Sequence, residues 1–333
     1  MVSKRRSVHM LIFLIAFGTS LLSEVLYCQA GNLEKIKIAY VPFCANHPYF
    51  VALEKGFFQK EGLQVESIKV ATSSEMMTAL ISGAVDALAP VSFASIFGVE
   101  QRQPGTIAAF LPGGETKGHV ISHILVKPDS PIKNMQDLFG KKIGTYSGSS
   151  QLMALKVILG GMGMNAERDI TIVQVAPELQ LPALESGQFD ALLTAEPYST
   201  VAMAKKLARV LVENPRSKYI VDPFVSGACA MMSSFVDKKQ DLARGVYRAM
   251  RAGAEFMQQQ PKEAKEILPK YVEITPDVLN ATDIYAFFQT DSVIIAASQT
   301  LADLSLKYQV LEKKVDAAAL FRAEAKLAGS SGR

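Results

Sequence analysis

Two short runs rich in serine stand where a predicted strand gives way to a predicted helix, at residues 72–74 and 147–150. The start of a helix presents unpaired backbone N–H groups and the positive end of the helix dipole. Serine hydroxyls beside these groups would complete a binding site for an anionic or strongly polar small molecule. The residue types at these positions therefore favour ligand binding.

The sequence offers little for catalysis or metal binding. Its three cysteines have no zinc-type spacing, its four histidines are scattered, and it contains neither a Walker loop nor a Gly-x-Ser-x-Gly motif. The formal charge is +3 over 333 residues, and the dispersed Lys and Arg argue against a nucleic-acid-binding surface. We therefore expect no catalytic residue, no cofactor, no metal ion and no nucleic-acid partner.

The elements that must position the serine runs contain a repeated pattern. The frame Leu-x-Ser-Gly-x-x-Asp-Ala-Leu occurs at residues 80–88 and again at 184–192. Its glycine suits a helix end that needs positive φ, and the apolar residues that follow suit a short buried strand. Each copy leads into a loop, at Pro90–Ser95 and Thr194–Ser199, and such loops form the ligand crevice of open α/β sheets. The repeat predicts an α/β fold with two lobes, although the glycine and the aspartate could serve packing alone.

The connections between the lobes follow from extended apolar segments. A strand is predicted at residues 107–111, followed by a loop that contains residues 113–114. The segment His119–Val126 is expected to cross into the second lobe, and Val225–Ser233 to return. From Phe235 onward the pattern is almost entirely helical.

The N-terminal segment differs in composition from the rest of the chain. Lys4–Arg6 is basic, Val8–Leu22 is almost wholly apolar, and Cys28-Gln29-Ala30 offers small residues for cleavage before Gly31. This pattern predicts a secretory signal peptide at residues 1–30 and hence an exported protein. A lipoprotein acylated at Cys28 and an uncleaved anchor are the alternatives.

The two cysteines beyond the signal peptide are Cys44 and Cys229. They could pair in an oxidising compartment. Their surroundings, a loop and a predicted buried strand, instead favour two free thiols that pack as small hydrophobic residues.

Three motifs in this sequence resemble those of one family of exported proteins. They are Ala52–Glu66 (ALEKGFFQKEGLQVE), the two Ser-Gly-x-x-Asp-Ala copies and Leu138–Gly144 (LFGKKIG). From about Ile36 to the C-terminus, and most densely up to Tyr198, the chain is similar to the nitrate, sulfonate, taurine and pyrimidine-precursor group of ABC-transporter substrate-binding proteins. The first motif is quite specific, whereas the third recurs in several families of binding proteins.

The resemblance implies a type II periplasmic-binding-protein fold, in which two crossing segments form a hinge between two α/β lobes. Lobe one would comprise residues 31–126 and 227–333, and lobe two residues 127–226. The resemblance also implies a periplasmic protein, expected to be a monomer, that captures a small molecule between its lobes and delivers it to an ABC permease and ATPase. A ligand closes such lobes only if it binds the closed state more tightly, so both lobes must contribute contacts.

The predicted ligand contacts are polar and aromatic residues on the loops that end strands and open helices. Several of the serines could instead be plain helix N-caps, and the histidine of the first loop could be a packing residue. The candidates are Phe43, Asn46, His47, Ser73, Ser74, Ser92 and Phe93 from lobe one, Ser147, Ser149, Ser150, Glu196 and Tyr198 from lobe two, and His119 and Ser226 near the crossings.

The candidate loops also bear on the kind of ligand. Their charges are mixed, and no arginine is present on them to bind a carboxylate or sulfonate through two hydrogen bonds. Aromatic residues are frequent, which suits a ligand with an apolar or planar part. We expect a small organic ligand, such as a sulfonate, an aromatic or a pyrimidine-like compound, rather than bare nitrate. An anion held only by helix N-termini and serines is the alternative.

Two other functions have to be weighed against solute transport. A pyrimidine-precursor synthase resembles these binding proteins in fold, but its family carries a cysteine-rich iron-binding run, and here only the isolated Cys44 and Cys229 remain. A ligand-presenting sensor would have the same two lobes. A neighbouring gene for a permease would indicate transport, and one for a chemoreceptor or kinase would indicate sensing.

Overall fold

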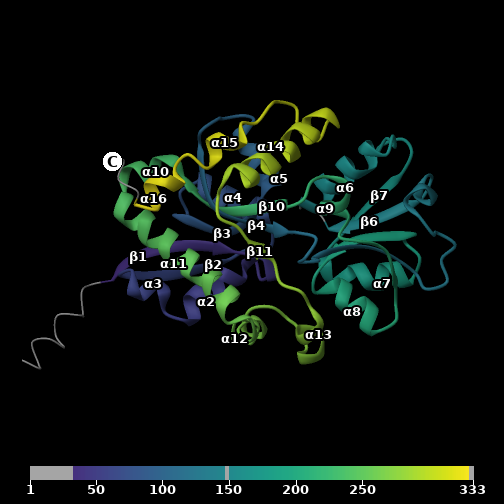
Figure 1. Cartoon of the computed structure of the whole chain (residues 1–333), viewed down its shortest axis with the longest axis horizontal. Coiled ribbons are helices and arrows are strands. Elements are labelled where there is room, and N and C mark those ends of the chain that lie inside the picture. Colours follow the sequence, from purple (N-terminus) through teal and green to yellow (C-terminus); the bar gives the residue numbers. More distant parts are fainter. Residues whose placement is uncertain (1–32, 147–149, 330–333) are drawn as a thin grey trace, which may run out of the picture.

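The computed structural model describes residues 33–146 and 150–329. Figure 1 shows two lobes side by side, each built on its own β-sheet. The sheet of lobe one has six strands in the order β11-β4-β10-β3-β1-β2, and that of lobe two has five in the order β7-β6-β8-β5-β9. Two α/β lobes joined by two crossings confirm the predicted fold class.

The elements of lobe one come from both ends of the chain. Its strands are β1 (Glu34–Tyr40), β2 (Leu63–Lys69), β3 (Ala87–Ser92), β4 (Ile107–Glu115), β10 (Phe224–Met232) and β11 (Ala286–Phe287). Its helices are α2 (His47–Glu54), α3 (Phe57–Lys60), α4 (Ser73–Ile81), α5 (Phe93–Glu100), α10 (Ser233–Lys238), α11 (Gln240–Gln259), α12 (Pro261–Lys265), α13 (Pro276–Ala281), α14 (Ser292–Lys307), α15 (Ala317–Leu320) and α16 (Glu324–Leu327), with 3₁₀ turns at Cys44–Asn46 and Leu268–Lys270.

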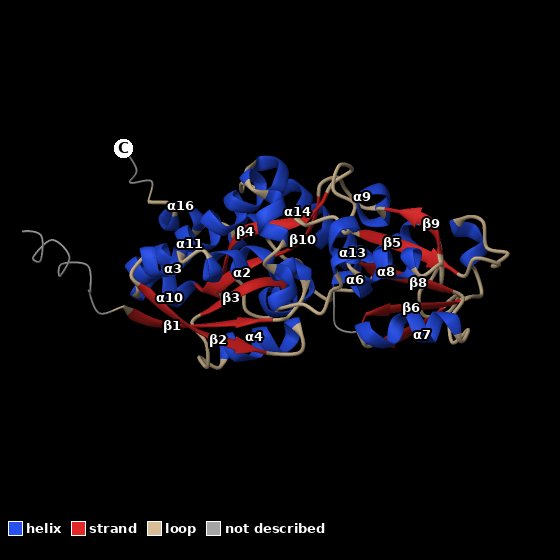
Figure 2. Cartoon of the chain, turned by 90° about the horizontal axis from the view of Figure 1, so that it is seen from below, coloured by secondary structure: helices blue, strands red, loops and turns tan. Residues whose placement is uncertain are grey.

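Lobe two is continuous in sequence. Its strands are β5 (Ser122–Val126), β6 (Lys142–Tyr146), β7 (Thr171–Val175), β8 (Ala191–Ala195) and β9 (Arg209–Glu213). Its helices are α6 (Ser150–Gly161), α7 (Gln180–Glu185), α8 (Tyr198–Ala204) and α9 (Pro215–Tyr219), with 3₁₀ turns at Met135–Leu138 and Pro177–Leu179. In both lobes, helices lie on both sides of the strands (Figure 2). Every residue of β4 in lobe one and of β5 and β8 in lobe two is buried, as expected for strands covered on both faces.

The sequence repeat forms the same structure in both lobes. Gly83 follows α4 with a φ of +73°, and Gly187 follows α7 with a φ of +76°. In lobe one the carboxylate of Asp86 accepts a hydrogen bond from the backbone N–H of Lys37 (2.9 Å). In lobe two Asp190 does the same for Lys142 (2.8 Å). The repeat is therefore a structural device, in which the glycine ends a helix and the aspartate ties the next strand to its parallel neighbour.

The crossings between the lobes lie slightly earlier in the chain than predicted. Residues 122–126 were expected in lobe one, but they form β5, which pairs with β8 and β9 of lobe two. The return was expected after residue 226, but β10 already pairs with β4 from Phe224 onward. The chain thus passes between the sheets at residues 116–121 and 220–223.

One further prediction of local structure was wrong. Residues 113–114 are not in a loop but in β4, because the absent side chains let neighbours approach closely. A Cβ on Gly113 would come within 2.6 Å of the Phe287 ring, and one on Gly114 within 1.9 Å of the Phe224 carbonyl oxygen. From Phe235 onward the chain is almost entirely helical, as predicted, and β11 adds a two-residue edge strand to β4.

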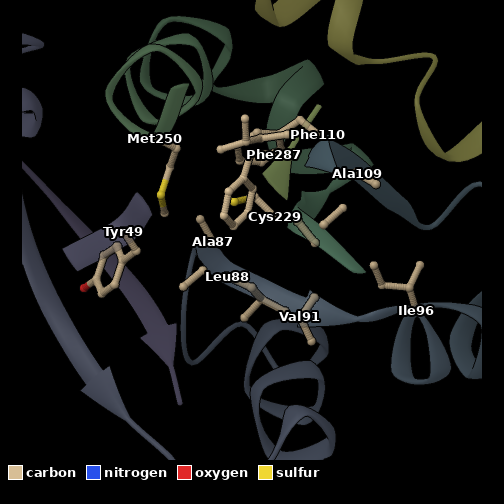
Figure 3. Packing of buried hydrophobic residues seen from close by; sticks show 14 of the residues in the cluster. Tyr49, Ala87, Leu88, Val91, Ile96, Ala109, Phe110, Cys229, Met250 and Phe287 are labelled. Carbon is tan, nitrogen blue, oxygen red and sulfur yellow. The ribbon is translucent and has the colours of Figure 1, made fainter. Parts of the chain in front are cut away.

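The main hydrophobic core lies in lobe one, between its sheet and its helices (Figure 3). Met250 of α11 faces Cys229 and Phe110 of the sheet there. Cys44 and Cys229 are both free and buried, which confirms the prediction that they do not pair. No helix of the described residues is long and apolar enough to cross a membrane. The predicted signal peptide, residues 1–30, lies outside the described part of the chain.

Candidate functional site

A cavity lies between the two lobes, where β1, β3 and β6 end and helices α4, α5 and α6 begin. The cavity has a volume of about 80 Å³. Lobe one forms most of the wall, and lobe two closes it from the opposite side. The described wall residues are Val41, Phe43, Ala45, Asn46, Ser73, Pro90, Val91, Ser92, Gly113, Tyr146, Ser150, Gln151, Ser226, Gly227, Tyr285 and Phe287.

Asn46 holds the first loop of lobe one in place. Its side-chain oxygen accepts a hydrogen bond from the Val41 N–H (3.0 Å), and its side-chain nitrogen donates to the Pro90 carbonyl (2.8 Å). Both ends of the amide are thus committed to backbone groups, and the side chain is only 2% exposed. The loop after β1 is therefore fixed to the end of β3, which shapes this part of the wall.

Three helices begin at the cavity. Thr72 caps α4 by accepting from the Glu75 N–H (3.1 Å), so Ser73 is the first helical residue. Ser92 caps α5 by accepting from the Ala94 N–H (3.1 Å), and its hydroxyl hydrogen remains available as a donor. Helix α6 begins at Ser150 on the side of lobe two. The three N-termini converge on one cavity and favour negative charge or acceptor atoms there.

A direct contact between the lobes narrows the cavity. The Tyr146 hydroxyl of lobe two donates to the Ala71 carbonyl of lobe one (3.4 Å). Burial, together with the nearby carboxylates of Glu178 and Glu75, raises the pKa of Tyr146. The phenol is therefore neutral at physiological pH and remains a hydrogen-bond donor.

None of the wall residues within the described ranges is charged at neutral pH. The polar groups that face the cavity are hydroxyls and amides, and the remainder of the wall is apolar or aromatic. Among the described residues, no group of three or more His, Cys, Asp or Glu side chains could hold a metal ion. The arrangement can bind and orient a ligand, and the described wall residues include no acid–base pair.

Six of the fourteen predicted contact residues line the cavity. His47 does not, because its ring points into lobe one, where Nε2 donates to the Ala264 carbonyl (2.7 Å) and burial lowers its pKa to about 4. Phe93 is fully buried and stacks on Phe97 with ring centroids 4.9 Å apart. Ser147 and Ser149 lie outside the described residues. Those on the wall are Phe43, Asn46, Ser73, Ser92, Ser150 and Ser226.

Two further predicted residues, one in lobe one and one on the crossing segment, also lie away from the cavity. Ser74 is exposed and borders a separate groove between α4, α5 and α6. His119 is half exposed on the crossing segment, where its Nδ1 lies 3.5 Å from Asp283 Oδ1. Position next to a strand end was therefore not sufficient to aim either side chain into the cleft.

Glu196 and Tyr198 lie at the start of α8, beside the cavity wall but not on it. The Glu196 carboxylate accepts from the Ser199 hydroxyl (2.7 Å) and the Thr200 N–H (3.3 Å), so it caps its own helix. Burial raises the pKa of Glu196. Burial also raises the pKa of Tyr198 to about 12, with smaller effects from Glu178 and from Cys44 of lobe one. Tyr198 is therefore close to the cleft, whereas the Glu196 carboxylate is used within lobe two.

Sequence reasoning missed several wall residues. Tyr285 and Phe287 come from the segment predicted to be helical, although the aromatic run Tyr285-Ala286-Phe287 has the composition of a strand. Gln151 follows directly on the serine run and could have been included by position. Tyr146, at the end of β6, was not among the predicted contacts.

Comparison with known proteins places this site in a family. The family model described as NMT1/THI5 like matches residues 45–264. A protein of Bacillus subtilis (strain 168) named for aliphatic-sulfonate binding is 24% identical over 281 residues, which span 81% of this chain and 80% of that protein.

Solved structures show the same fold. The alkanesulfonate-binding protein SsuA from Xanthomonas axonopodis pv. citri, bound to MOPS, has a TM-score of 0.72 at 18% identity and covers 87% of this chain and 99% of its own. The periplasmic nitrate-binding protein NrtA from Synechocystis PCC 6803 has a TM-score of 0.68 at 15% identity and covers 90% of this chain and 89% of its own. The two lobes and the cleft are those of the periplasmic-binding-protein fold. Within it, this chain belongs to the NMT1/THI5-like family.

Proposed function

We propose that this protein is the exported solute-binding component of an ABC importer. Its cleft takes a small organic ligand that carries one anionic or hydrogen-bond-accepting group, and a short alkanesulfonate is the first class to test. The observation that carries the proposal is a cavity between two lobes on which three helix N-termini converge. The relatives named for sulfonate and nitrate binding support an anionic ligand.

The lining of the cavity favours an organic ligand over bare nitrate. The cavity has a volume of about 80 Å³, which suits a small ligand. Nitrate would fill part of this space and leave Phe43, Val91 and Phe287 without an apolar partner. A short alkyl group attached to the anion would cover these residues, while its oxygens face the helix N-termini.

The wall supports binding without chemical conversion. Its described residues include no cysteine, histidine or carboxylate that could act as a nucleophile or a general base. The proposed partners are therefore a permease and an ATPase that receive the unchanged ligand.

Thermal unfolding of residues 31–333 tests the proposal. The panel contains nitrate, methanesulfonate, ethanesulfonate, benzenesulfonate and pyrimidine. A compound at about a hundred times its dissociation constant stabilises the folded chain by about 2.7 kcal/mol. For a chain of this length that raises Tm by about 4 °C. Stabilisation by the short sulfonates supports the proposal, stabilisation by nitrate alone contradicts the organic ligand, and no shift with any compound contradicts the ligand class.

A further inference from the structure

A buried ion pair lies behind the cavity wall, close to where the chain crosses between the lobes. Arg216 of α9 donates from Nε to Glu115 Oε1 (3.1 Å) and from Nη2 to Oε2 (2.8 Å), and neither side chain is more than 1% exposed. Two further groups donate to the same carboxylate, the Ser122 hydroxyl (2.9 Å) and the Ser217 N–H (3.3 Å). Glu115 therefore neutralises Arg216, with three donors on its Oε1 and one on its Oε2.

Tyr285 connects this ion pair to the cavity. β11 pairs with β4 in an antiparallel register that sets Ala286 opposite Gly114. One step further along, the register sets Tyr285 opposite Glu115, and opposite residues of an antiparallel pair share one face of the sheet. The Arg216 guanidinium is close enough to the Tyr285 phenol to interact with it electrostatically. Tyr285 is also part of the cavity wall.

The chemistry of the two groups limits how they can interact. A guanidinium carries only donors, so towards Arg216 the phenol oxygen can act only as an acceptor. Burial raises the pKa of Tyr285, so the phenol keeps its proton. Among the described residues, no carbonyl or carboxylate accepts a hydrogen bond from the Tyr285 hydroxyl. The proton is therefore free to be donated to a molecule in the cavity.

We propose that Tyr285 is a specificity-determining hydrogen-bond donor of the cleft, that Arg216 positions it, and that it binds an acceptor oxygen of the ligand. The inference rests on the proposed function and deepens it. The three helix N-termini approach the ligand from the strand ends, and Tyr285 approaches it from the hinge. Because Glu115 neutralises Arg216, the cleft gains an oriented donor there without a net positive charge.

Titration calorimetry with methanesulfonate as the probe tests the role of Tyr285. Tyr285→Phe removes the donor and keeps the ring, and it should weaken binding by about 10- to 100-fold, the usual range for a hydrogen bond to a charged group. Tyr271→Phe is the matched control, since the Tyr271 hydroxyl donates to Glu54 Oε1 (2.8 Å) away from the cavity wall. This control should bind methanesulfonate as tightly as the wild type.

Glu115→Gln tests whether the Arg216 guanidinium acts on the cleft, through a change that structural damage would not produce. The substitution keeps the shape of the side chain but leaves the guanidinium charge uncompensated close to the cavity. Binding of methanesulfonate should then increase by on the order of tenfold. Binding of dimethyl sulfone, a neutral molecule of similar size, should stay the same. A distorted site would weaken both probes and contradict the assignment to Arg216. If this variant does not fold, Tyr285→Phe alone decides.

The outcomes separate this inference from the proposed function. If methanesulfonate does not bind the wild-type protein, the proposed function fails and the inference fails with it. If the wild type binds and Tyr285→Phe binds equally well, only the inference is overturned. A selective loss of methanesulfonate affinity in a folded Tyr285→Phe variant, with Tyr271→Phe binding as the wild type does, establishes Tyr285 as the donor.

Discussion

Replacing Gly160 with alanine should weaken ligand binding without altering the cavity wall. Gly160 lies near the end of the 12-residue helix α6, about 15 Å from Ser150, which opens this helix at the cavity. A Cβ on Gly160 would come within 2.4 Å of the Tyr308 ring. Tyr308 follows α14 of lobe one, whereas Gly160 belongs to lobe two, so the contact joins the lobes far from the ligand.

The size of the effect follows from this distance. Carbon atoms in contact prefer a separation of about 3.5–4.0 Å, so the ring would have to retreat by roughly 1 Å or more. Overpacking of this kind costs about 1–3 kcal/mol. This cost raises the free energy of the arrangement in which the two lobes meet, which is the arrangement that binds the ligand. Ligand affinity should therefore decrease about 5- to 150-fold.

Titration calorimetry with methanesulfonate measures the effect, and two variants control it. Gly161→Ala is the matched control, because a Cβ there lies at an ordinary 3.7 Å from the Tyr308 hydroxyl. The double variant Gly160→Ala/Tyr308→Ala should recover most of the affinity, since it removes the ring. The reasoning is refuted if Gly160→Ala binds as tightly as the wild type, or if the double variant binds as weakly as the single one.

Two further predictions concern stability rather than binding. The pKa of His47 falls from 6.5 to about 4 on folding, so the unfolded chain binds more protons between these pH values and stability is lost as the pH drops through this window. Protonation of this group should lower the free energy of unfolding of the wild type by on the order of 3 kcal/mol. Urea denaturation at pH 7, 5.5 and 4.5 should show a smaller loss for His47→Gln. Equal losses in the two proteins would contradict the assignment. Asp86→Ala and Asp190→Ala should each lower the free energy of unfolding by about 1–3 kcal/mol, because each frees one strand N–H. Methanesulfonate affinity should change little in both aspartate variants, and a large loss of affinity would show that the aspartates act on the cleft.

Patterns with a local physical cause were predictable from the sequence. The glycine and aspartate of the repeat act within a few residues of their own helix and on the neighbouring strand, so both copies formed the expected structure. The N-cap Thr72 was likewise predictable, because a hydroxyl before an acidic third residue suits a helix start. The two-lobed fold followed from these local units.

The directions in which individual side chains point were much less predictable. His47 and Phe93 stand at helix starts beside the cavity, as expected, yet both point into the core of lobe one. A helix start fixes where a backbone begins, but the turn of the helix decides which side chains face the cleft and which face the sheet. Ser73 and Ser150, which open their helices, and Ser92, which caps α5, do line the wall.

The hinge side of the cleft could not have been found from loops near strand ends. Arg216 and Glu115 are separated by about a hundred residues in sequence, and Tyr285 lies a further stretch beyond them. They meet because β11 joins the edge of β4 and α9 packs at the crossing, which are contacts of tertiary structure. The sequence showed no arginine on the candidate loops, and the structure agrees that none lines the described wall. An arginine nevertheless acts on the cleft through Tyr285, which explains how a neutral cavity in this fold could favour a ligand with acceptor oxygens.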